Sequence, residues 1–220
     1  MEEVVIRKFK AEDREPVRDI AWETAFIGEP AAAFFFGKSI LADFLTLYFT
    51  DYEPDSCFVA VFKSQVVGYL IGCQDTRVMA SIFKKKILAG LLAKFLFSGV
   101  FLRLKNLRLI FNFARSFFKG EFNMGEVNSD YPATLHINLK KDFRGKGEGA
   151  RLISAFQVYL VSKGVKGLHL ATMSSAAGAF FSRQDFILLS KHPRSYFRHL
   201  LTQEVSVYIY AKKLGTTVFD

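Results

Sequence analysis

A glycine-rich turn carries the most specific chemistry in this sequence. Residues 138–150 read Asn-Leu-Lys-Lys-Asp-Phe-Arg-Gly-Lys-Gly-Glu-Gly-Ala, between a strand-like stretch at 135–139 and a helix-like stretch at 149–163. The first N–H groups of a helix lack intrahelical acceptors and lie at the positive end of the helix dipole. Glycine adds left-handed backbone angles and lets an anion approach closely. The turn therefore predicts an anion site built from backbone N–H groups.

Two common phosphate loops do not match this turn. The dinucleotide-binding pattern GxGxxG follows the first strand of a domain, and an acidic residue comes about twenty positions later. Here the glycines have the spacing Arg-Gly-Lys-Gly-Glu-Gly and come late in the chain. The pattern GxxxxGK followed by Ser or Thr is absent.

The turn resembles the acetyl-CoA signature of the GNAT acetyltransferase superfamily, which is Arg or Gln, two residues, Gly, one residue, then Gly or Ala. Arg144, Gly147 and Gly149 match it, with a strand before and a helix after. Residues 58–72 resemble the second and third strands of that family. Residues 168–186 resemble its fifth strand, the following helix and a closing Gly-Phe pair, with Asp185-Phe186 in that place.

A narrower resemblance concerns the stretches at 51–58 and 130–137. They are similar to a bacterial subgroup related to the acetyltransferase-like domain of O-GlcNAcase. The family resemblance as a whole covers most of the chain, except about 77–128.

The resemblance implies acetyl-CoA as the cofactor. It assigns the pyrophosphate to Arg144, Gly145, Lys146, Gly147, Glu148, Gly149 and Ala150. It also implies that the backbone of Ile137 and Leu139 pairs with the pantetheine arm. The expected reaction is direct attack of a primary amine, from a small molecule or a peptide, in a ternary complex. A loop needed only for chain geometry is the alternative.

His136 and Asn138 are the predicted catalytic residues, because the two-residue period of a strand puts both on one face. An unperturbed histidine pKa of about 6.5 suits a base, although a histidine hydrogen-bonded under a loop is the alternative. Many GNAT enzymes place an acid tyrosine five residues before the closing phenylalanine, where this chain has Phe181. A non-catalytic acyl-CoA-binding or cofactor-free module therefore stays open as a second function.

Three further residues are predicted to bind the acceptor. Tyr52 and Glu53 follow the second helix-like segment, and Tyr131 lies at the entrance to the strand at 135–139. Their alternative role is a solvated turn. The two cysteines, Cys57 and Cys73, lack the spacing of a metal site, so no metal is predicted. Few cysteines and no secretory signal favour a cytoplasmic protein.

Charge is concentrated in one segment. The net charge is +9, and residues 77–119 contain ten Lys or Arg and no Asp or Glu, which leaves about −1 for the rest. Phenylalanines are interleaved with these cations. Three interpretations remain: a helical insertion packed on the domain or on a second copy in a homodimer, a surface for anionic membrane, and, least favoured, nucleic-acid contact. The apolar run at 87–102 is shorter than the ~20 residues of a bilayer span.

The remaining pattern predicts the fold class. Strand-like and helix-like segments follow in the order βααββ, insertion, βαβαββ. This order predicts an α/β domain over residues 1–220, with a central mixed antiparallel and parallel sheet flanked by helices. A helical insertion at about 77–128 separates the third and fourth strands.

Overall fold

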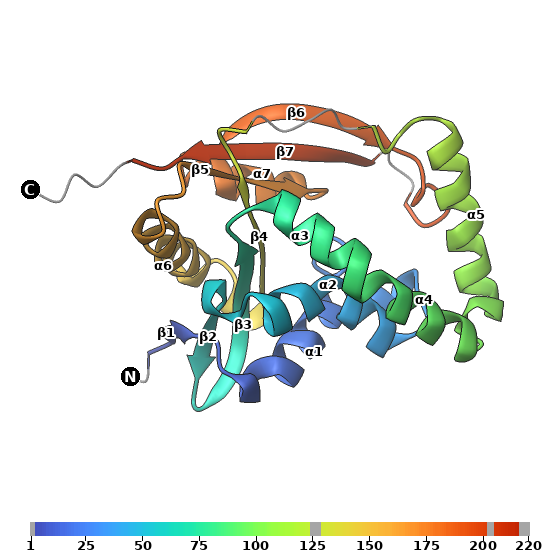
Figure 1. Cartoon of the computed structure of the whole chain (residues 1–220), viewed down its shortest axis with the longest axis horizontal. Coiled ribbons are helices and arrows are strands. Elements are labelled where there is room, and N and C mark those ends of the chain that lie inside the picture. Colours follow the sequence, from blue (N-terminus) through green and yellow to red (C-terminus); the bar gives the residue numbers. More distant parts are fainter. Residues whose placement is uncertain (1–2, 124–128, 202–204, 216–220) are drawn as a thin grey trace, which may run out of the picture.

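The computed structural model describes residues 3–123, 129–201 and 205–215. One seven-stranded sheet has the order β1-β2-β3-β4-β5-β7-β6 (Figure 1). Its strands are β1 (Val5–Lys8), β2 (Phe58–Phe62), β3 (Gln65–Cys73), β4 (Ala133–Leu139), β5 (Gly167–Thr172), β6 (Ile187–Arg194) and β7 (Val205–Lys213). The helices are α1 (Arg14–Thr24), α2 (Lys38–Tyr52), α3 (Thr76–Ile82), α4 (Leu88–Phe97), α5 (Leu104–Phe118), α6 (Glu148–Ser162) and α7 (Ser175–Ser182). The predicted mixed α/β fold is confirmed.

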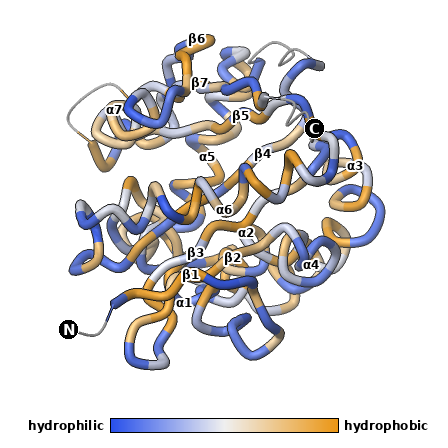
Figure 2. Tube along the Cα trace, turned by 90° about the vertical axis from the view of Figure 1, so that its left-hand side faces the viewer, coloured by the Kyte–Doolittle hydropathy of each residue, from blue (hydrophilic) through white to orange (hydrophobic). Residues whose placement is uncertain are grey.

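Helices cover both faces of the sheet because the strands alternate apolar side chains between them. On one face Leu135 and Leu170 pack with Phe156 of α6 in the largest buried cluster. On the other face Tyr69 and Ile71 pack against Ile20 of α1. Figure 2 shows hydrophobic and hydrophilic residues following one another closely along these elements, as amphipathic segments require.

The sheet opens between β4 and β5. β4 pairs with β3 along its length, from Thr134 opposite Cys73 to Leu139 opposite Gly68. It pairs with β5 in parallel only at its first two residues, Ala133 and Thr134. Beyond Thr134 the two strands diverge, so the β5-facing edge of β4 has no strand beside it among the residues that the structure describes.

The segment between β3 and β4 is helical, as predicted. It consists of α3, a π-helical turn (Phe83–Ile87), α4, a short 3-10 turn (Val100–Leu102) and α5; its residues 124–128 lie outside the described residues. α4 is tied to the body through Lys94, whose Nζ lies 2.7 Å from Asp43 Oδ2 of α2. Within the described residues, no helix combines the length and hydropathy needed to cross a membrane.

α5 is anchored at both ends. Near its start the buried Asn106 accepts a hydrogen bond from Phe36 N (2.8 Å) and donates one to Phe36 O (2.7 Å). Near its end Phe113 stacks on Tyr196, which follows β6, with ring centroids 4.5 Å apart. Ser195 N donates to Glu121 Oε2 at 2.7 Å. α5 therefore spans from the α1–α2 connection to the β6–β7 connection (Figure 1).

Candidate active site

The glycine turn leads directly into α6. Gly145 and Gly147 have φ angles of 74° and 92°, and Gly147 is the N-cap of α6. A Cβ built on either residue would meet no atom within 4 Å, so the turn is open to solvent. In the described part of the chain, no N–H from Gly145 to Ala150 donates a hydrogen bond to protein. Six donors are thus available to an anion.

The side chains of Lys146 and Glu148 contribute less to the anion site than the backbone N–H groups of the turn. Glu148 is buried, and its carboxylate accepts a hydrogen bond from Arg151 NH1 at 2.8 Å. Arg151 in turn donates to Val4 O. Lys146 is exposed, with its Nζ 5.7 Å from the centroid of the Phe143 ring. The predicted roles of Glu148 and its neighbours in cofactor binding therefore depend on N–H groups, not on carboxylate or amine.

Arg144 fastens the turn to two other segments. Its Nε donates to Leu139 O at 2.9 Å, and its NH2 donates to Gly28 O at 2.9 Å. Two of the N–H groups of the Arg144 guanidinium are therefore bonded within the protein. Arg144 therefore positions the turn, and its contact with the pyrophosphate stays a prediction.

The open edge of β4 presents alternate backbone groups. Lys140 N donates to Val67 O at 2.8 Å, which sets the hydrogen-bonded register with β3. By the two-residue period of the antiparallel ladder, the polar groups of Asn138 and His136 then face β3, and those of Leu139 and Ile137 face the diverged β5. Leu139 O is already bonded to Arg144. Ile137 thus has the orientation predicted for a pantetheine partner.

A polar cluster lies on the α1 side of β3 and β4. Asn138 Nδ2 donates to the Tyr69 hydroxyl at 2.9 Å, and that hydroxyl lies 3.2 Å from His136 Nδ1. Asn138 Nδ2 also lies 3.5 Å from His136 Nε2. Burial lowers the pKa of His136 to about 4 and raises that of the Tyr69 hydroxyl. His136 is therefore neutral at pH 7.

The sequence contains no motif that marks Tyr69 as a site residue. It lies directly opposite Asn138 in the β3–β4 register. The pairing of Tyr69 with Asn138 does not follow from the local sequence, because the whole insertion separates β3 from β4.

The three residues predicted to bind the acceptor lie outside the cluster of Tyr69, His136 and Asn138. Glu53 accepts hydrogen bonds from the Tyr48 hydroxyl (2.8 Å) and from Gln74 N (2.9 Å). Tyr52 stacks on Tyr48, with centroids 6.2 Å apart. Tyr131 is buried, and its Cδ1 would lie 2.9 Å from a Cβ on Gly167, at the paired end of β4 and β5. These contacts are structural, and acceptor binding by these residues stays a prediction.

Phe181 of α7 belongs to the hydrophobic core. Its ring is 5% exposed and lies 5.7 Å from that of Phe186 and 6.2 Å from that of Tyr210, centroid to centroid. Asp185, in the place of the family's glycine, has a φ of 62°. The turn thus keeps the left-handed geometry that glycine normally supplies.

The hydroxyl group of Tyr210, a residue of β7, lies beside α7. A Cβ on Gly178, one turn before Phe181, would lie 2.5 Å from the Tyr210 hydroxyl oxygen. Gly178 therefore makes room for this hydroxyl. Tyr210 pairs with Leu170 of β5, just beyond the point where β4 and β5 diverge. No sequence signal marked this residue, because its position depends on strand pairing.

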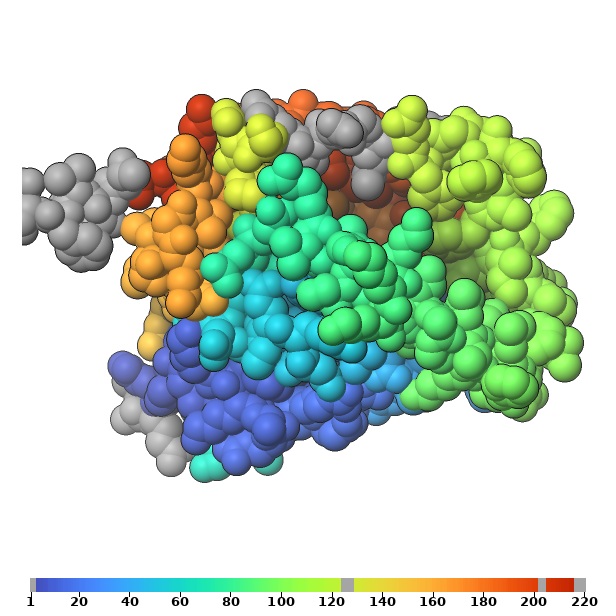
Figure 3. Space-filling view, in the orientation of Figure 1, coloured from blue at the N-terminus to red at the C-terminus, as the bar shows by residue number. Residues whose placement is uncertain are grey.

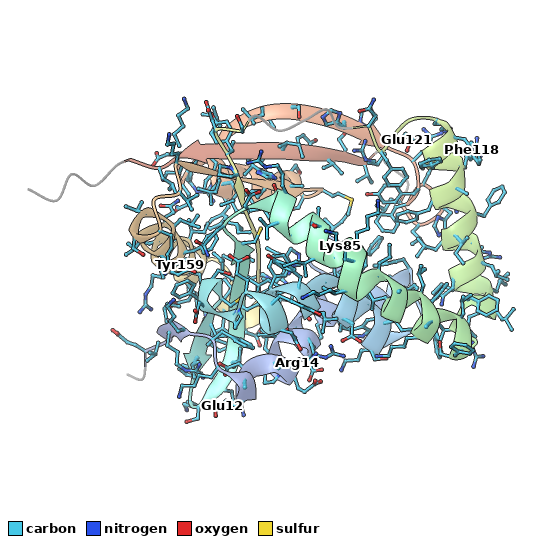
Figure 4. The ribbon with its side chains drawn as sticks, viewed as in Figure 1. Glu12, Arg14, Lys85, Phe118, Glu121 and Tyr159 are labelled. Atoms are coloured by element: carbon cyan, nitrogen blue, oxygen red, sulfur yellow. The ribbon has the colours of Figure 1, made fainter. Side chains whose placement is uncertain are left out.

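A hollow opens on one side of the molecule. Figure 3 shows the surface recessed between α3–α4 and the β6–β7 hairpin, with α5 along a third side. Figure 4 shows Glu121 at the end of α5 facing the hairpin, whereas Phe118 projects outward. The insertion thus supplies two walls of the hollow.

Comparison with known proteins identifies the fold. No protein-family model and no curated protein matches the chain. Solved structures do match. SsHAT has a TM-score of 0.72 at 22% identity, covering 97% of this chain and 99% of that one. The Drosophila melanogaster polyamine N-acetyltransferase, which forms N-acetylagmatine, has a TM-score of 0.61 at 15% identity, with coverage of 96% and 100%.

A third match is a GNAT superfamily phosphinothricin acetyltransferase from Sinorhizobium meliloti in complex with acetyl-CoA. Its TM-score is 0.57 at 14% identity, covering 99% of this chain and 91% of that one. At these identities the likeness establishes the fold. The chain has the fold of the GNAT acetyltransferases.

Proposed function

We propose that the chain is an acetyl-CoA-dependent N-acetyltransferase that acts on a primary amine. The observation that carries the proposal is the juxtaposition of two features. Six N–H groups without protein acceptors, from Gly145 to Ala150, lie at the start of α6. The unpaired edge of β4 leads away from them. The solved structure with acetyl-CoA shares this fold and supports the proposal.

The residues present fit the cofactor. Positive φ angles at Gly145 and Gly147, with open space around both, let two phosphate groups reach the backbone. Ile137 offers an amide pair at the β4 edge for an extended, peptide-like arm. When bound, acetyl-CoA supplies an activated acetyl thioester.

His136 fits a hydrogen-bonding role toward the amine. An alkylammonium has a pKa near ~10.4, whereas the pKa of His136 is lowered to about 4. A direct proton transfer to His136 is therefore strongly uphill. His136 and Asn138 instead orient an amine that arrives neutral or that loses its proton to water. This differs from the base of ordinary pKa that the sequence predicted.

The Tyr210 hydroxyl takes the place of the missing acid tyrosine. It reaches α7 beside Phe181, from a different element. A phenol hydroxyl can donate its proton to the departing thiolate of CoA. Support comes from the contact with Gly178, which only glycine permits.

Calorimetric titration with acetyl-CoA tests the proposal. Gly147→Asp places a carboxylate in the anion site and should abolish binding. Gly164→Asp is the matched control, because Gly164 also has a positive φ (71°) and open surroundings but lies at the other end of α6. Equal binding by wild type and Gly147→Asp would refute the site.

Turnover separates the enzyme from the alternative, a non-catalytic module. Phe181 in the core is the observation that favours this alternative. Release of CoA thiol is measured across a panel of amines, peptides included. Tight acetyl-CoA binding without turnover on any amine would favour the module over the enzyme.

A further inference from the structure

α5 divides its surface into three sectors. At about 100° per residue, one stripe faces the body, and its buried members are Asn106, Leu109 and Ser116. An apolar sector comprises Leu104, Leu107, Ile110, Phe111, Ala114, Phe117 and Phe118, all exposed. A basic sector beside it comprises Lys105, Arg108, Arg115 and Lys119. We call the apolar and basic sectors together the outer face of α5.

The exposure of the outer face is unusual for a protein in water. Phe118 is 86% exposed, Phe111 68% and Leu104 64%. Figure 4 shows Phe118 pointing away from the body. The corner between α4 and α5 continues the pattern, with Phe97 92% and Leu102 66% exposed. A contiguous patch of this kind marks an interaction site.

α4, like α5, has exposed apolar side chains next to cations. Leu88, Leu92 and Leu96 are spaced at four residues, which places them along one side of the helix, and all three are exposed. Lys84 and Lys85 precede them in the π-helical turn and are also exposed. Apolar side chains with cations beside them therefore extend over both helices.

Several of these cations are uncompensated. Residues 77–119 contain ten basic and no acidic residues. Lys94 and Lys119 reach carboxylates on Asp43 and Glu121. Lys84, Lys85, Arg108 and Arg115 form no ion pair within the part of the chain that the structure describes.

We propose that α4 and α5 dock this protein on the surface of an anionic lipid bilayer, with α5 lying in the plane of the interface. The apolar sector enters the boundary between headgroups and acyl chains, and the adjacent cations contact lipid phosphates. The orientation follows from α5 itself. Its inward stripe is held by the protein, so only its outer face can meet the membrane.

Charge decides against a second copy of the chain. A symmetric contact through this face would bring two cationic segments together, with no acidic residue in either between positions 77 and 119. Side-chain type decides against nucleic acid. Leu104, Leu107 and Ile110 share the sector with the phenylalanines, and aliphatic side chains cannot stack on bases as aromatic ones do.

The test is co-sedimentation of the full chain with vesicles. Phosphatidylcholine vesicles are compared with vesicles containing phosphatidylserine, at low and high salt. Binding is expected only with phosphatidylserine and should weaken as salt rises. Phe111→Ser with Phe118→Ser removes the apolar anchors and should lower partitioning at least tenfold. Val158→Ser is the control, because Val158 is 69% exposed on α6.

A second pair of variants tests the charges. Arg108→Glu with Arg115→Glu should lower partitioning at least tenfold, since each cation near an anionic surface contributes about fivefold. Lys166→Glu changes an exposed residue outside the insertion, just before β5, and should have little effect. Circular dichroism and melting curves confirm that each variant is folded.

Four results would overturn the proposal. They are no sedimentation with phosphatidylserine at low salt, binding that survives both pairs of variants, a dimer by light scattering that Phe111→Ser with Phe118→Ser dissociates, and binding to single-stranded nucleic acid in preference to vesicles. None of these measurements depends on acetyl transfer, so the proposed enzyme could fail while the docking surface stands.

Discussion

The guanidinium of Arg144 donates a hydrogen bond to the carbonyl oxygen of Gly28 at 2.9 Å, across 116 residues of chain. The same side chain holds Leu139 O at the end of β4. One residue of the glycine turn therefore joins the anion site, the open edge of β4 and the α1–α2 connection. The signature arginine positions the turn as well as adding charge to it.

Arg144→Lys should weaken acetyl-CoA binding about tenfold. Lysine keeps the charge but lacks the planar fork that reaches two carbonyl groups at once, and hydrogen bonds from charged donors contribute about 1.5–3 kcal/mol. Calorimetry measures the dissociation constant. If Arg144→Lys binds like wild type while Arg144→Ala does not, charge alone matters and the positioning role is wrong.

Replacing His136 should flatten the dependence of stability on pH. The folded pKa of His136 is about 4, below the ordinary 6.5. The unfolded chain therefore binds the proton more readily, so this stabilisation is complete above pH 6.5 and is lost as pH falls toward 4. Between pH 7 and pH 5 the loss is about 2 kcal/mol.

Urea unfolding at the two pH values measures this loss in wild type and in His136→Gln. His169→Gln should also reduce the pH dependence, because burial lowers the pKa of His169 as well. A pH dependence identical in wild type and His136→Gln would contradict the burial of a neutral His136.

Tyr210→Phe should lower kcat about 10²-fold or more, with little change in KM. General acid catalysis is typically worth about 10² to 10⁴ in rate, and phenylalanine keeps the packing against Phe181. Steady-state kinetics with the best amine of the panel measure the effect. Tyr159→Phe removes a buried phenol on α6 and serves as the control. Equal kcat losses in both variants would assign Tyr210 a structural role only.

Asp43→Asn should destabilise the fold by about 2–3 kcal/mol. Burial favours the neutral acid, but hydrogen bonds from Lys94 and Arg18 outweigh it and lower the pKa of Asp43. Its stabilisation is therefore present at neutral pH and is lost only as pH falls below about 3.8. The exposed pair of Asp19 and Lys38, 2.7 Å apart, gives the control Asp19→Asn, which should cost less than about 1 kcal/mol. Thermal unfolding at pH 7 compares the two.

The sequence predicts those features that residues close together in the chain determine, such as turns, helix ends and the faces of a strand. The helix-like stretch predicted at 149–163 is confirmed as α6, because capping and helix termination involve residues within one or two turns. The face shared by His136 and Asn138 followed from strand alternation. The insertion was predicted to be helical, and it contains α3, α4 and α5.

Contacts between residues far apart in the chain determine the surroundings of the candidate site residues. The lowered pKa of His136 comes from burial, and its hydrogen-bonding partner Tyr69 lies 67 residues away in the chain. Tyr210 reaches α7 only because β7 lies between β5 and β6. Glu53 and Tyr131 were predicted from nearby sequence, yet Glu53 also bonds to Gln74 and Tyr131 lies against Gly167, which come later in the chain. The sequence by itself determined which backbone could hold an anion; only the tertiary structure decided which side chains surround it, because burial and strand order depend on residues far apart in the chain.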